Sequence, residues 1–330
     1  MWPAGRVNVF PLGQPLKTVL WAIYLERSRG WRQCLRVRWA LVRRSIKPVP
    51  NPHRPTTRSE ASLPIGVFDS GLGGLTVARA LHRLLPREDL VYLGDTARVP
   101  YGAKSPATVV RFACEDMQFL MNHRVKAVVV ACNTVSAWAL PTLEQRFGVP
   151  VFGVILPGAR AALAATRNGR IGVIATNATI RSQAYNKAIL SRDDTVRIIA
   201  RACPLLVPLV EEGWMNHPVA EDVLREYLAP LLHWGIDTLV LGCTHYPVMK
   251  ETIGLVTGPN VRLVDSADTC AAFVKERLGC LKLLHTRRRR AGAIESFVTD
   301  EVERFEDFAE RFLGEKIVPA RKVELPALDP

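Results

Sequence analysis

The sequence lacks long hydrophobic runs, paired cysteine motifs and nucleotide-binding fingerprints, and each absence excludes a class of protein. No apolar run reaches the ~20 residues that a membrane-spanning helix needs. The seven cysteines are odd in number, scattered, and form no CxxC pair. This argues against a disulfide framework and a zinc knuckle, and it favours a reducing cytoplasm. The segment GLGG at 71–74 is not a GxGxxG fingerprint and no Walker A sequence is present, so a nucleotide is not the expected ligand.

Positive charge is concentrated in residues 1–63, which contribute +10 to the net charge of +13. Residues 64–330 therefore carry only +3, and we expect no nucleic-acid partner for them. The segment 1–63 also holds four of the seven tryptophans and ends in the loop-like stretch KPVPNPHRPTTRSEAS. Three interpretations of it stay open: a poorly ordered extension, an over-extended translation start, or a basic segment that contacts an anionic membrane surface.

From residue 64 onward, short β-rich runs alternate with helical patterns such as Leu75–Leu85, Ala107–His123 and Val219–Trp234. This alternation is typical of an α/β protein whose parallel sheets are covered by helices on both faces. Ligands of such sheets bind at the carboxyl ends of the strands. The predicted strands are Ile65–Phe68, Leu90–Leu93, Ala127–Ala131, Val151–Val154, Arg170–Ala175, Val196–Ala200, Thr238–Gly242 and Val261–Val264.

Two halves of this region resemble each other. IGVFDSG at 65–71 is similar to IGVIATN at 171–177, and each segment precedes a cysteine-bearing corner. The first corner is VVVACNTVSA at 128–137, and the second is LVLGCTHYPV at 239–248. We interpret this as a duplication that produces two related α/β units facing one another.

Each corner places a cysteine, Cys132 or Cys243, between a predicted strand and the start of a helix. A helix N-terminus can stabilise a thiolate, and the polar residues Asn133, Thr134 and Thr244 that follow can bind a carboxylate. Either cysteine alone would be interpreted as a buried structural thiol. The matched pair favours a shared task, because inverting a stereocentre needs a base on one face of the carbon and an acid on the other.

Three further residues are candidates to assist the two thiols. Asp69, after the first predicted strand, is placed to assist Cys132, whereas His245 and Glu211 are candidates to assist Cys243. Each also has a structural interpretation, as a helix cap, a core histidine or a surface charge.

Other polar residues at strand ends are candidate pocket residues. Ser70 precedes the glycine-rich turn, and Tyr101-Gly102 end the turn-rich segment GDTARVPYG, which suits a lid or a pocket wall. Thr176 and Thr179 lie at another strand-to-helix junction, where hydroxyls and amides can hold carboxylate oxygens.

Seven motifs spread over about 64–325 resemble those of the glutamate racemases, within the aspartate/glutamate racemase family. They are GVFDSGLGGLTV, YLGDTARVPYG, ACNTVSA, GVIATNATIRS, CPLLVPLVEEGW, LVLGCTHYP and FVTDEVERFEDFAERFLG. The resemblance implies two pseudo-symmetric, flavodoxin-like, doubly wound domains with the active site in the cleft between them. It also implies that the last helices return to the first domain, which gives 64–159 plus 271–330 for the first domain and 160–270 for the second.

The resemblance further implies a cofactor-independent, metal-free interconversion of L- and D-glutamate in the cytoplasm, which supplies D-glutamate for peptidoglycan. Cys132 would then work on the D-enantiomer and Cys243 on the L-enantiomer, and we expect a homodimer. Leu156 stands where the family usually has Glu or Gln, and 1–63 has no counterpart in the family pattern. The implied substrate contacts are Asp69, Ser70, Tyr101, Gly102, Asn133, Thr134, Thr176, Thr179, Thr244 and His245.

Other functions stay open at this point. The same fold could racemise aspartate or another amino acid, although the CTHYP corner favours glutamate. A cysteine-dependent amidase or hydrolase would use His245 as the base for Cys243 but would leave Cys132 without a role. An amino-acid-binding protein without turnover is hard to reconcile with two intact corners.

Overall fold

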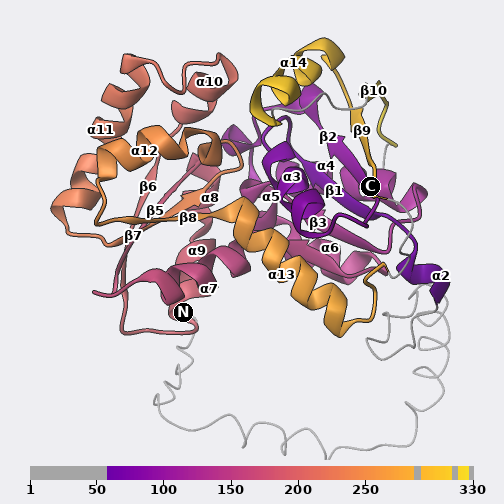
Figure 1. Ribbon diagram of the computed structural model, residues 1–330, viewed down its shortest axis with the longest axis horizontal. Helices are drawn as coiled ribbons and strands as arrows, with labels where there is room; N and C mark the ends of the chain where they lie inside the picture. The colour runs from indigo at the N-terminus through magenta and orange to yellow at the C-terminus, as the bar shows by residue number, and fades with distance from the viewer. Residues whose placement is uncertain (1–57, 286–290, 314–318, 327–330) are drawn as a thin grey trace, which may run out of the picture. The chain divides into compact units, whose positions relative to one another are not determined.

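The computed structural model describes residues 58–285, 291–313 and 319–326 (Figure 1). Predictions about residues 1–57, which make up most of the basic segment, lie outside the described residues. Within the described part, the strands form two sheets in which all pairs of neighbouring strands are parallel. The predicted α/β class with parallel sheets is confirmed.

The first sheet has six strands and the second has four among the described residues. The first contains β1 (Ile65–Asp69), β2 (Leu90–Gly94), β3 (Ala127–Val130), β4 (Val151–Gly153), β9 (Ile294–Val298) and β10 (Arg321–Lys322). The second contains β5 (Arg170–Ala175), β6 (Arg197–Ala202), β7 (Thr238–Gly242) and β8 (Arg262–Asp265). All eight predicted strands are present with small shifts of their ends, whereas β9 and β10 were not predicted.

The helices connect these strands and cover the sheets (Figure 1). None of the described helices is long and apolar enough to cross a membrane. The α-helices are α2 (Arg58–Ala61), α3 (Leu75–Leu84), α4 (Pro106–Asn122), α5 (Asn133–Trp138), α6 (Leu140–Arg146), α7 (Ile155–Ala165), α8 (Asn177–Ser182), α9 (Ala184–Leu190), α10 (Leu206–Glu211), α11 (Pro218–His233), α12 (Lys250–Thr257), α13 (Ser266–Cys280) and α14 (Val302–Leu313). Short 3-10 helices are η1 (Thr96–Arg98), η2 (Tyr101–Ala103) and η3 (Tyr246–Met249).

Both sheets have the same strand order around their first strand. The first sheet contains the order β2-β1-β3-β4, and the second has the order β6-β5-β7-β8. In each, the direction of winding changes between the first and third strands, and such switch points are where doubly wound sheets bind ligands. The duplication inferred from two short sequence motifs is therefore repeated in the topology.

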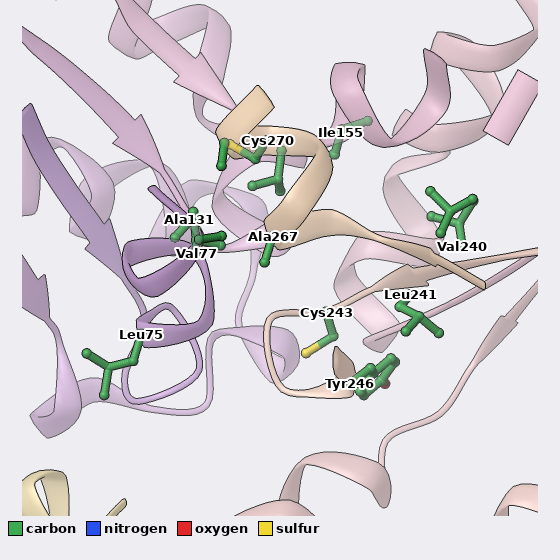
Figure 2. Packing of buried hydrophobic residues seen from close by; sticks show 14 of the residues in the cluster. Leu75, Val77, Ala131, Ile155, Val240, Leu241, Cys243, Tyr246, Ala267 and Cys270 are labelled. Carbon is green, nitrogen blue, oxygen red and sulfur yellow. The ribbon is translucent and has the colours of Figure 1, made fainter. Parts of the chain in front are cut away.

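One apolar core connects the two sheets. Its buried residues include Ile65 and Leu75 from the first-sheet region and Ile171 and Leu241 from the second-sheet region. Helix α13 packs against α3, which follows β1, and also against α7, β7 and β8. Figure 2 shows part of this core, to which Cys243 belongs. Burial on both faces explains why strands such as β1 and β7 are continuous apolar runs rather than alternating ones.

A buried ion pair fastens the N-terminal end of the described chain to the first sheet. The Lys126 ammonium is buried, pairs with Glu88 and donates a hydrogen bond to the Ala61 carbonyl oxygen at 2.8 Å. Glu88 also accepts a hydrogen bond from the backbone N–H of His285 at 2.7 Å. Ala61 belongs to α2 and therefore to the segment 1–63. This part of the segment contacts the region that begins at residue 64, and the sequence did not indicate that contact.

We expect loss of the Ala61 contact to lower the stability of the described part of the chain. A chain that starts at Pro64 loses the Ala61 carbonyl, which leaves a buried ammonium donor short of a partner at a cost of about 1–3 kcal/mol in the free energy of unfolding. A chain that starts at Arg58 keeps that partner and serves as the control. Thermal and urea unfolding of the two chains and the full protein measure the difference. Equal stability of all three would contradict the anchoring contact.

Candidate active site

The four strand ends at the two switch points carry the predicted site residues. Asp69 ends β1, Cys132 follows β3, Thr176 follows β5 and Cys243 follows β7. Cys132 is the N-cap of α5, and Thr176 is the N-cap of α8. Because parallel strands end at the same edge of their sheet, each pair of adjacent strands brings its two end residues together. Both cysteine side chains are buried, each with 5% exposure.

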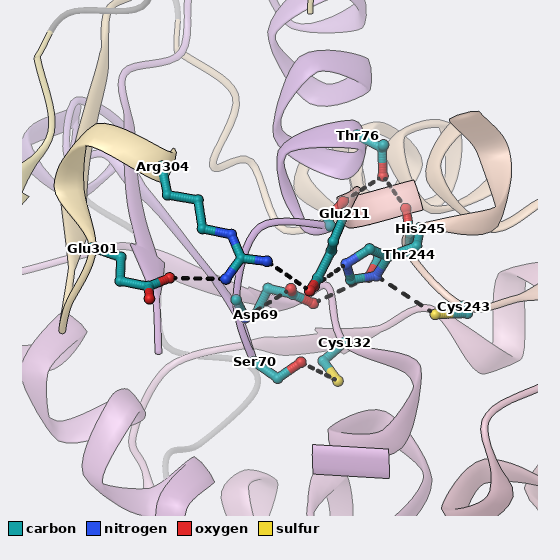
Figure 3. A network of polar contacts seen from close by, with 12 residues as sticks. Asp69, Ser70, Thr76, Cys132, Glu211, Cys243, Thr244, His245, Glu301 and Arg304 are labelled. Atoms are coloured by element: carbon teal, nitrogen blue, oxygen red, sulfur yellow. Dashed lines mark hydrogen bonds and ion pairs between the residues drawn. The ribbon is translucent and has the colours of Figure 1, made fainter. Parts of the chain in front are cut away.

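The Cys132 thiol lies in a surrounding that favours its protonated form. Its Sγ donates to the Ser70 hydroxyl at 3.5 Å (Figure 3). Burial and, next, the negative charge of Asp69 raise the pKa of Cys132 to about 12, against the weaker effect of the Ser70 hydrogen bond. At neutral pH the ligand-free protein therefore holds Cys132 as a thiol.

The Cys243 thiol has a different partner. Its Sγ lies 3.8 Å from His245 Nδ1, and His245 Nε2 donates to Glu211 Oε1 at 3.1 Å (Figure 3). Burial alone would lower the pKa of His245, but its hydrogen bonds to Cys243 and Glu211 outweigh burial and raise that pKa to about 10. The imidazole is therefore protonated at neutral pH, and an imidazolium next to sulfur is a countercharge for a thiolate.

Asp69 acts on both corners, because its charge raises the pKa of Cys132 and its carboxylate contacts Thr244. Its carboxylate is fully buried, accepts from the Gly71 backbone N–H at 3.0 Å and accepts from the Thr244 hydroxyl at 3.4 Å. Burial raises the pKa of Asp69, while the charge of His245 and the hydrogen bonds act in the opposite direction. The sequence placed Asp69 beside Cys132 alone, because the second corner is 175 residues away along the chain.

Three threonines from the two sheet regions form a compact hydroxyl cluster. Thr134 Oγ1 lies 3.0 Å from Thr176 Oγ1 and 3.2 Å from Thr179 Oγ1, and the latter two oxygens are 3.0 Å apart. Gly102 packs so closely here that an added Cβ would lie 2.9 Å from the Thr176 Cβ. The fold therefore brings together Gly102 and the threonines that the sequence singled out separately.

Asn133 has a buried amide donor to which none of the described residues is hydrogen-bonded. Its Oδ1 accepts from the Tyr185 hydroxyl at 2.7 Å, whereas its Nδ2 is buried without a hydrogen-bond partner among the described residues. Buried donors are normally satisfied, so an orphaned amide at a strand end indicates a place for a ligand oxygen. Tyr185, which orients this amide, was not found from the sequence because it lies near the start of α9, in a segment without a recognised motif.

The Tyr101 hydroxyl is bound to carboxylates rather than directed to the predicted substrate pocket. It donates to Asp95, and a second carboxylate oxygen, of Asp116, lies 3.3 Å away. Arg98 pairs with the same two aspartates, at 2.6 and 3.2 Å, and with Glu115. Burial and the neighbouring carboxylates raise the pKa of Tyr101, so its phenol stays protonated and bound to this cluster. The substrate contact of Tyr101 stays a prediction, and its hydroxyl is already bound within this cluster.

Two residues near the second corner were missed by the sequence analysis. An added Cβ at Gly73 would lie 2.5 Å from His245 Nδ1, so only glycine leaves room for the imidazole. The Thr76 hydroxyl donates to the Thr244 carbonyl at 3.1 Å and holds the corner from α3 (Figure 3). The GLGG segment thus provides space for a side chain from the other sheet region.

Most of the described chain matches a known family. A family model described as Asp/Glu/Hydantoin racemase matches residues 65–274. The chain belongs to this racemase family. A glutamate racemase from Geobacter metallireducens is 51% identical over 263 residues, which are 80% of this chain and 97% of that protein. One from Neisseria meningitidis is 50% identical over 263 residues, covering 79% of this chain and 97% of that protein.

Solved structures of racemases have the same architecture. A glutamate racemase isoform from Bacillus anthracis has a TM-score of 0.78 at 40% identity, over 81% of this chain and 99% of that one. The Thermus thermophilus enzyme, solved in complex with beta-chloro-D-alanine, has a TM-score of 0.73 at 48% identity, over the same shares of 81% and 99%. The family resemblance drawn from the sequence motifs is confirmed. No group of three or more His, Cys, Asp or Glu in the described part of this racemase could hold a metal ion.

We expect Gly73→Ala to lower racemase activity by displacing His245. A methyl group at Gly73 must push the imidazole or the backbone, and a misplacement of about 1 Å at a catalytic group can cost on the order of 100-fold in rate. Gly254→Ala is the matched control, since an added Cβ there meets nothing within 4 Å. Steady-state kinetics of the two purified variants, with circular dichroism to check folding, decide the matter. A folded Gly73→Ala variant with normal turnover would show that His245 tolerates another position.

Proposed function

We propose that this protein interconverts L-glutamate and D-glutamate by direct proton transfer at Cα, with Cys132 and Cys243 as the two acid/base groups. The observation that carries the proposal is the matched placement of two buried cysteines in unequal surroundings: Cys132 as a thiol and Cys243 beside a protonated His245. The relatives named glutamate racemase, at 46 to 51% identity, support glutamate as the substrate. So does a Francisella tularensis racemase solved with D-glutamate, which is 38% identical.

In the L-to-D direction, the Cys243 thiolate removes the Cα proton of L-glutamate. The electron pair of the broken C–H bond moves onto the substrate's α-carboxylate, and the Cys132 thiol then delivers its proton to the opposite face of Cα. The D-to-L direction exchanges the roles of the two sulfurs. Each direction uses one thiolate and one thiol, so protons and electrons balance without a cofactor.

The surroundings of the two thiols differ, and this difference bears on the protonation of the site before substrate binds. Burial and the charge of Asp69 favour the thiol form of Cys132, and the protonated His245 lies beside the Cys243 sulfur that removes the proton of L-glutamate. A raised pKa makes the Cys132 thiolate, once formed, a strong base for the reverse reaction. Because enantiomers have equal free energies in water, kcat/KM must be the same in both directions, and any asymmetry can appear only in kcat and KM separately.

The substrate carboxylates need donors, and the site offers hydroxyls and an amide rather than an arginine clamp. The unused Nδ2 of Asn133 and the threonine cluster support binding of carboxylate oxygens near the first corner. Asp69 contacts Thr244 of the second corner, and His245 of the same corner contacts the Cys243 sulfur. The proposed substrate contacts remain Asp69, Ser70, Tyr101, Gly102, Asn133, Thr134, Thr176, Thr179, Thr244 and His245.

The proposed reaction also fits a cellular role. D-glutamate formed in this way would enter peptidoglycan synthesis, whose soluble precursors are made in the cytoplasm, and we propose that location. The homodimer expected from the sequence stays a prediction, and sedimentation of the purified full chain tests it.

We expect glutamine and aspartate to be poor substrates. Glutamine lacks the distal charge, and aspartate is one methylene shorter, so either leaves buried donors of the site without their oxygen partners. Such mismatches can reduce kcat/KM by on the order of 10⁴-fold where a site is built around the missing group. Circular dichroism of L-glutamate, L-aspartate and L-glutamine solutions with enzyme follows each reaction. Comparable turnover of aspartate or glutamine would contradict the assignment.

We expect the product to carry solvent deuterium long before the substrate does. In D₂O, the proton removed by one thiolate stays on that sulfur while the other thiol donates deuterium. Early in the reaction, mass spectrometry of the separated enantiomers should find deuterated product and almost undeuterated substrate. Equal early labelling of both enantiomers would mean that a single base serves both faces.

Single cysteine variants are the controls for that experiment. Cys132→Ala and Cys243→Ala should each abolish racemisation, since neither retains both a base and an acid. We expect the remaining sulfur to exchange the Cα proton of one enantiomer only: L-glutamate in Cys132→Ala and D-glutamate in Cys243→Ala. A hydrolase would instead lose activity only in Cys243→Ala, so the pair of variants separates the two functions.

A further inference from the structure

The second cysteine has a neighbour that comes from the far end of the chain. Helix α14 follows β9 of the first sheet and packs against α3, yet its Arg304 reaches a carboxylate of α10, which follows β6 of the second sheet. Arg304 Nη2 lies 3.5 Å from Glu211 Oε2, and Arg304 Nη1 lies 3.1 Å from Glu301 Oε2 (Figure 3). The contact therefore joins a helix that follows a strand of the first sheet to a helix that follows a strand of the second.

Glu211 uses one oxygen for each neighbour. Oε1 accepts from His245 Nε2 at 3.1 Å, and Oε2 faces Arg304. With His245 Nδ1 at 3.8 Å from the Cys243 sulfur, four side chains form a row that runs from α14 to the thiol. We propose that Arg304 is a positioning residue for racemisation: it holds the Glu211 carboxylate in the orientation that presents His245 to Cys243.

The geometry of the row explains why a second partner matters. A carboxylate with one partner can rotate about its terminal bond, and its other oxygen would then be free to compete for the imidazole N–H. An arginine on Oε2 removes this freedom, since charge-assisted hydrogen bonds fix the direction of both groups. Helix α14 supports the imidazole a second time through the Phe308 ring, whose centroid lies 6.2 Å from that of His245.

The charges around the row determine the direction of the electrostatic effect. Asp69, Cys243 and Glu211 are the titratable groups that interact with His245, while Arg304 faces Glu211 and is itself shared with Glu301. Burial alone would raise the pKa of Glu211, but the hydrogen bond and charge of His245 and then the charge of Arg304 outweigh it and lower that pKa. A lowered pKa keeps Glu211 ionised as the pH falls, so removing Arg304 moves its protonation to higher pH.

The test compares three variants, and it rests on the proposed racemisation of glutamate by the wild-type chain. Arg304→Gln should reduce kcat by about two- to fivefold with little change in KM, because a pair of which the arginine is 45% exposed is screened by water. The acid limb of the kcat/KM profile should move to higher pH. Arg304→Lys should recover part of the loss, since it keeps the charge without the planar fork. Arg321→Gln, which removes an exposed pair with Glu295 remote from both cysteines, is the matched control and should behave like wild type.

Half-reactions separate positioning from a general structural effect. In the Cys132→Ala background, adding Arg304→Gln should slow exchange of the L-glutamate Cα proton by Cys243. In the Cys243→Ala background, the same change should leave exchange of D-glutamate by Cys132 unaltered. Wild-type kcat with an unshifted acid limb in Arg304→Gln would overturn the proposal, as would equal losses in both backgrounds. If the wild-type chain itself failed to racemise glutamate, the proposed function would fail instead, so the two failures are distinguishable.

Discussion

The chemistry of this protein depends on one constraint: two separate sheets must present their switch points to a common centre. A strand end in one sheet supplies only one cysteine with its neighbours. The continuous apolar core, with residues such as Ile65 and Ile171, and the packing of α13 against elements of both sheets fix the relation between the two ends. Cross-sheet hydrogen bonds, including Thr244 to Asp69, are consequences of that fixed relation.

The inferred duplication gives the two units the same strand order, whereas different residues around the two cysteines make the two halves of the site unequal. The strand orders around β1 and β5 are the same, so both corners inherit a cysteine at the end of the third strand of the unit. The first corner surrounds its thiol with a hydroxyl and a carboxylate, whereas the second surrounds its thiol with a histidine. Two groups of the same kind thereby lie in different electrostatic surroundings, and enzymes assign acid and base roles through such differences.

Small residues decide how closely the two sheet regions approach. Gly73 leaves room for His245, and Gly102 lies against Thr176, so two of the closest contacts across the site involve residues without side chains. A larger residue at either position would force apart the groups that must meet. The tightly held Tyr101 and Arg98 cluster acts in the same direction, because it fixes the segment that carries Gly102.

The sequence determined the class of fold, the eight strands with strong apolar runs, and both cysteine corners, since these depend on local patterns of a few residues. It also predicted Asp69, Glu211 and His245 as candidate assistants of the thiols, and that role stays a prediction. Strand β9 was not predicted because it mixes polar with apolar residues. Strand β10 was not predicted because it consists of only two residues, both exposed. Tertiary structure alone decided that Asp69 reaches Thr244, that the Tyr101 hydroxyl is taken up by carboxylates, and that Arg304 meets Glu211. These are contacts between segments whose distance in space is set by packing of the whole chain, and no local pattern encodes that distance.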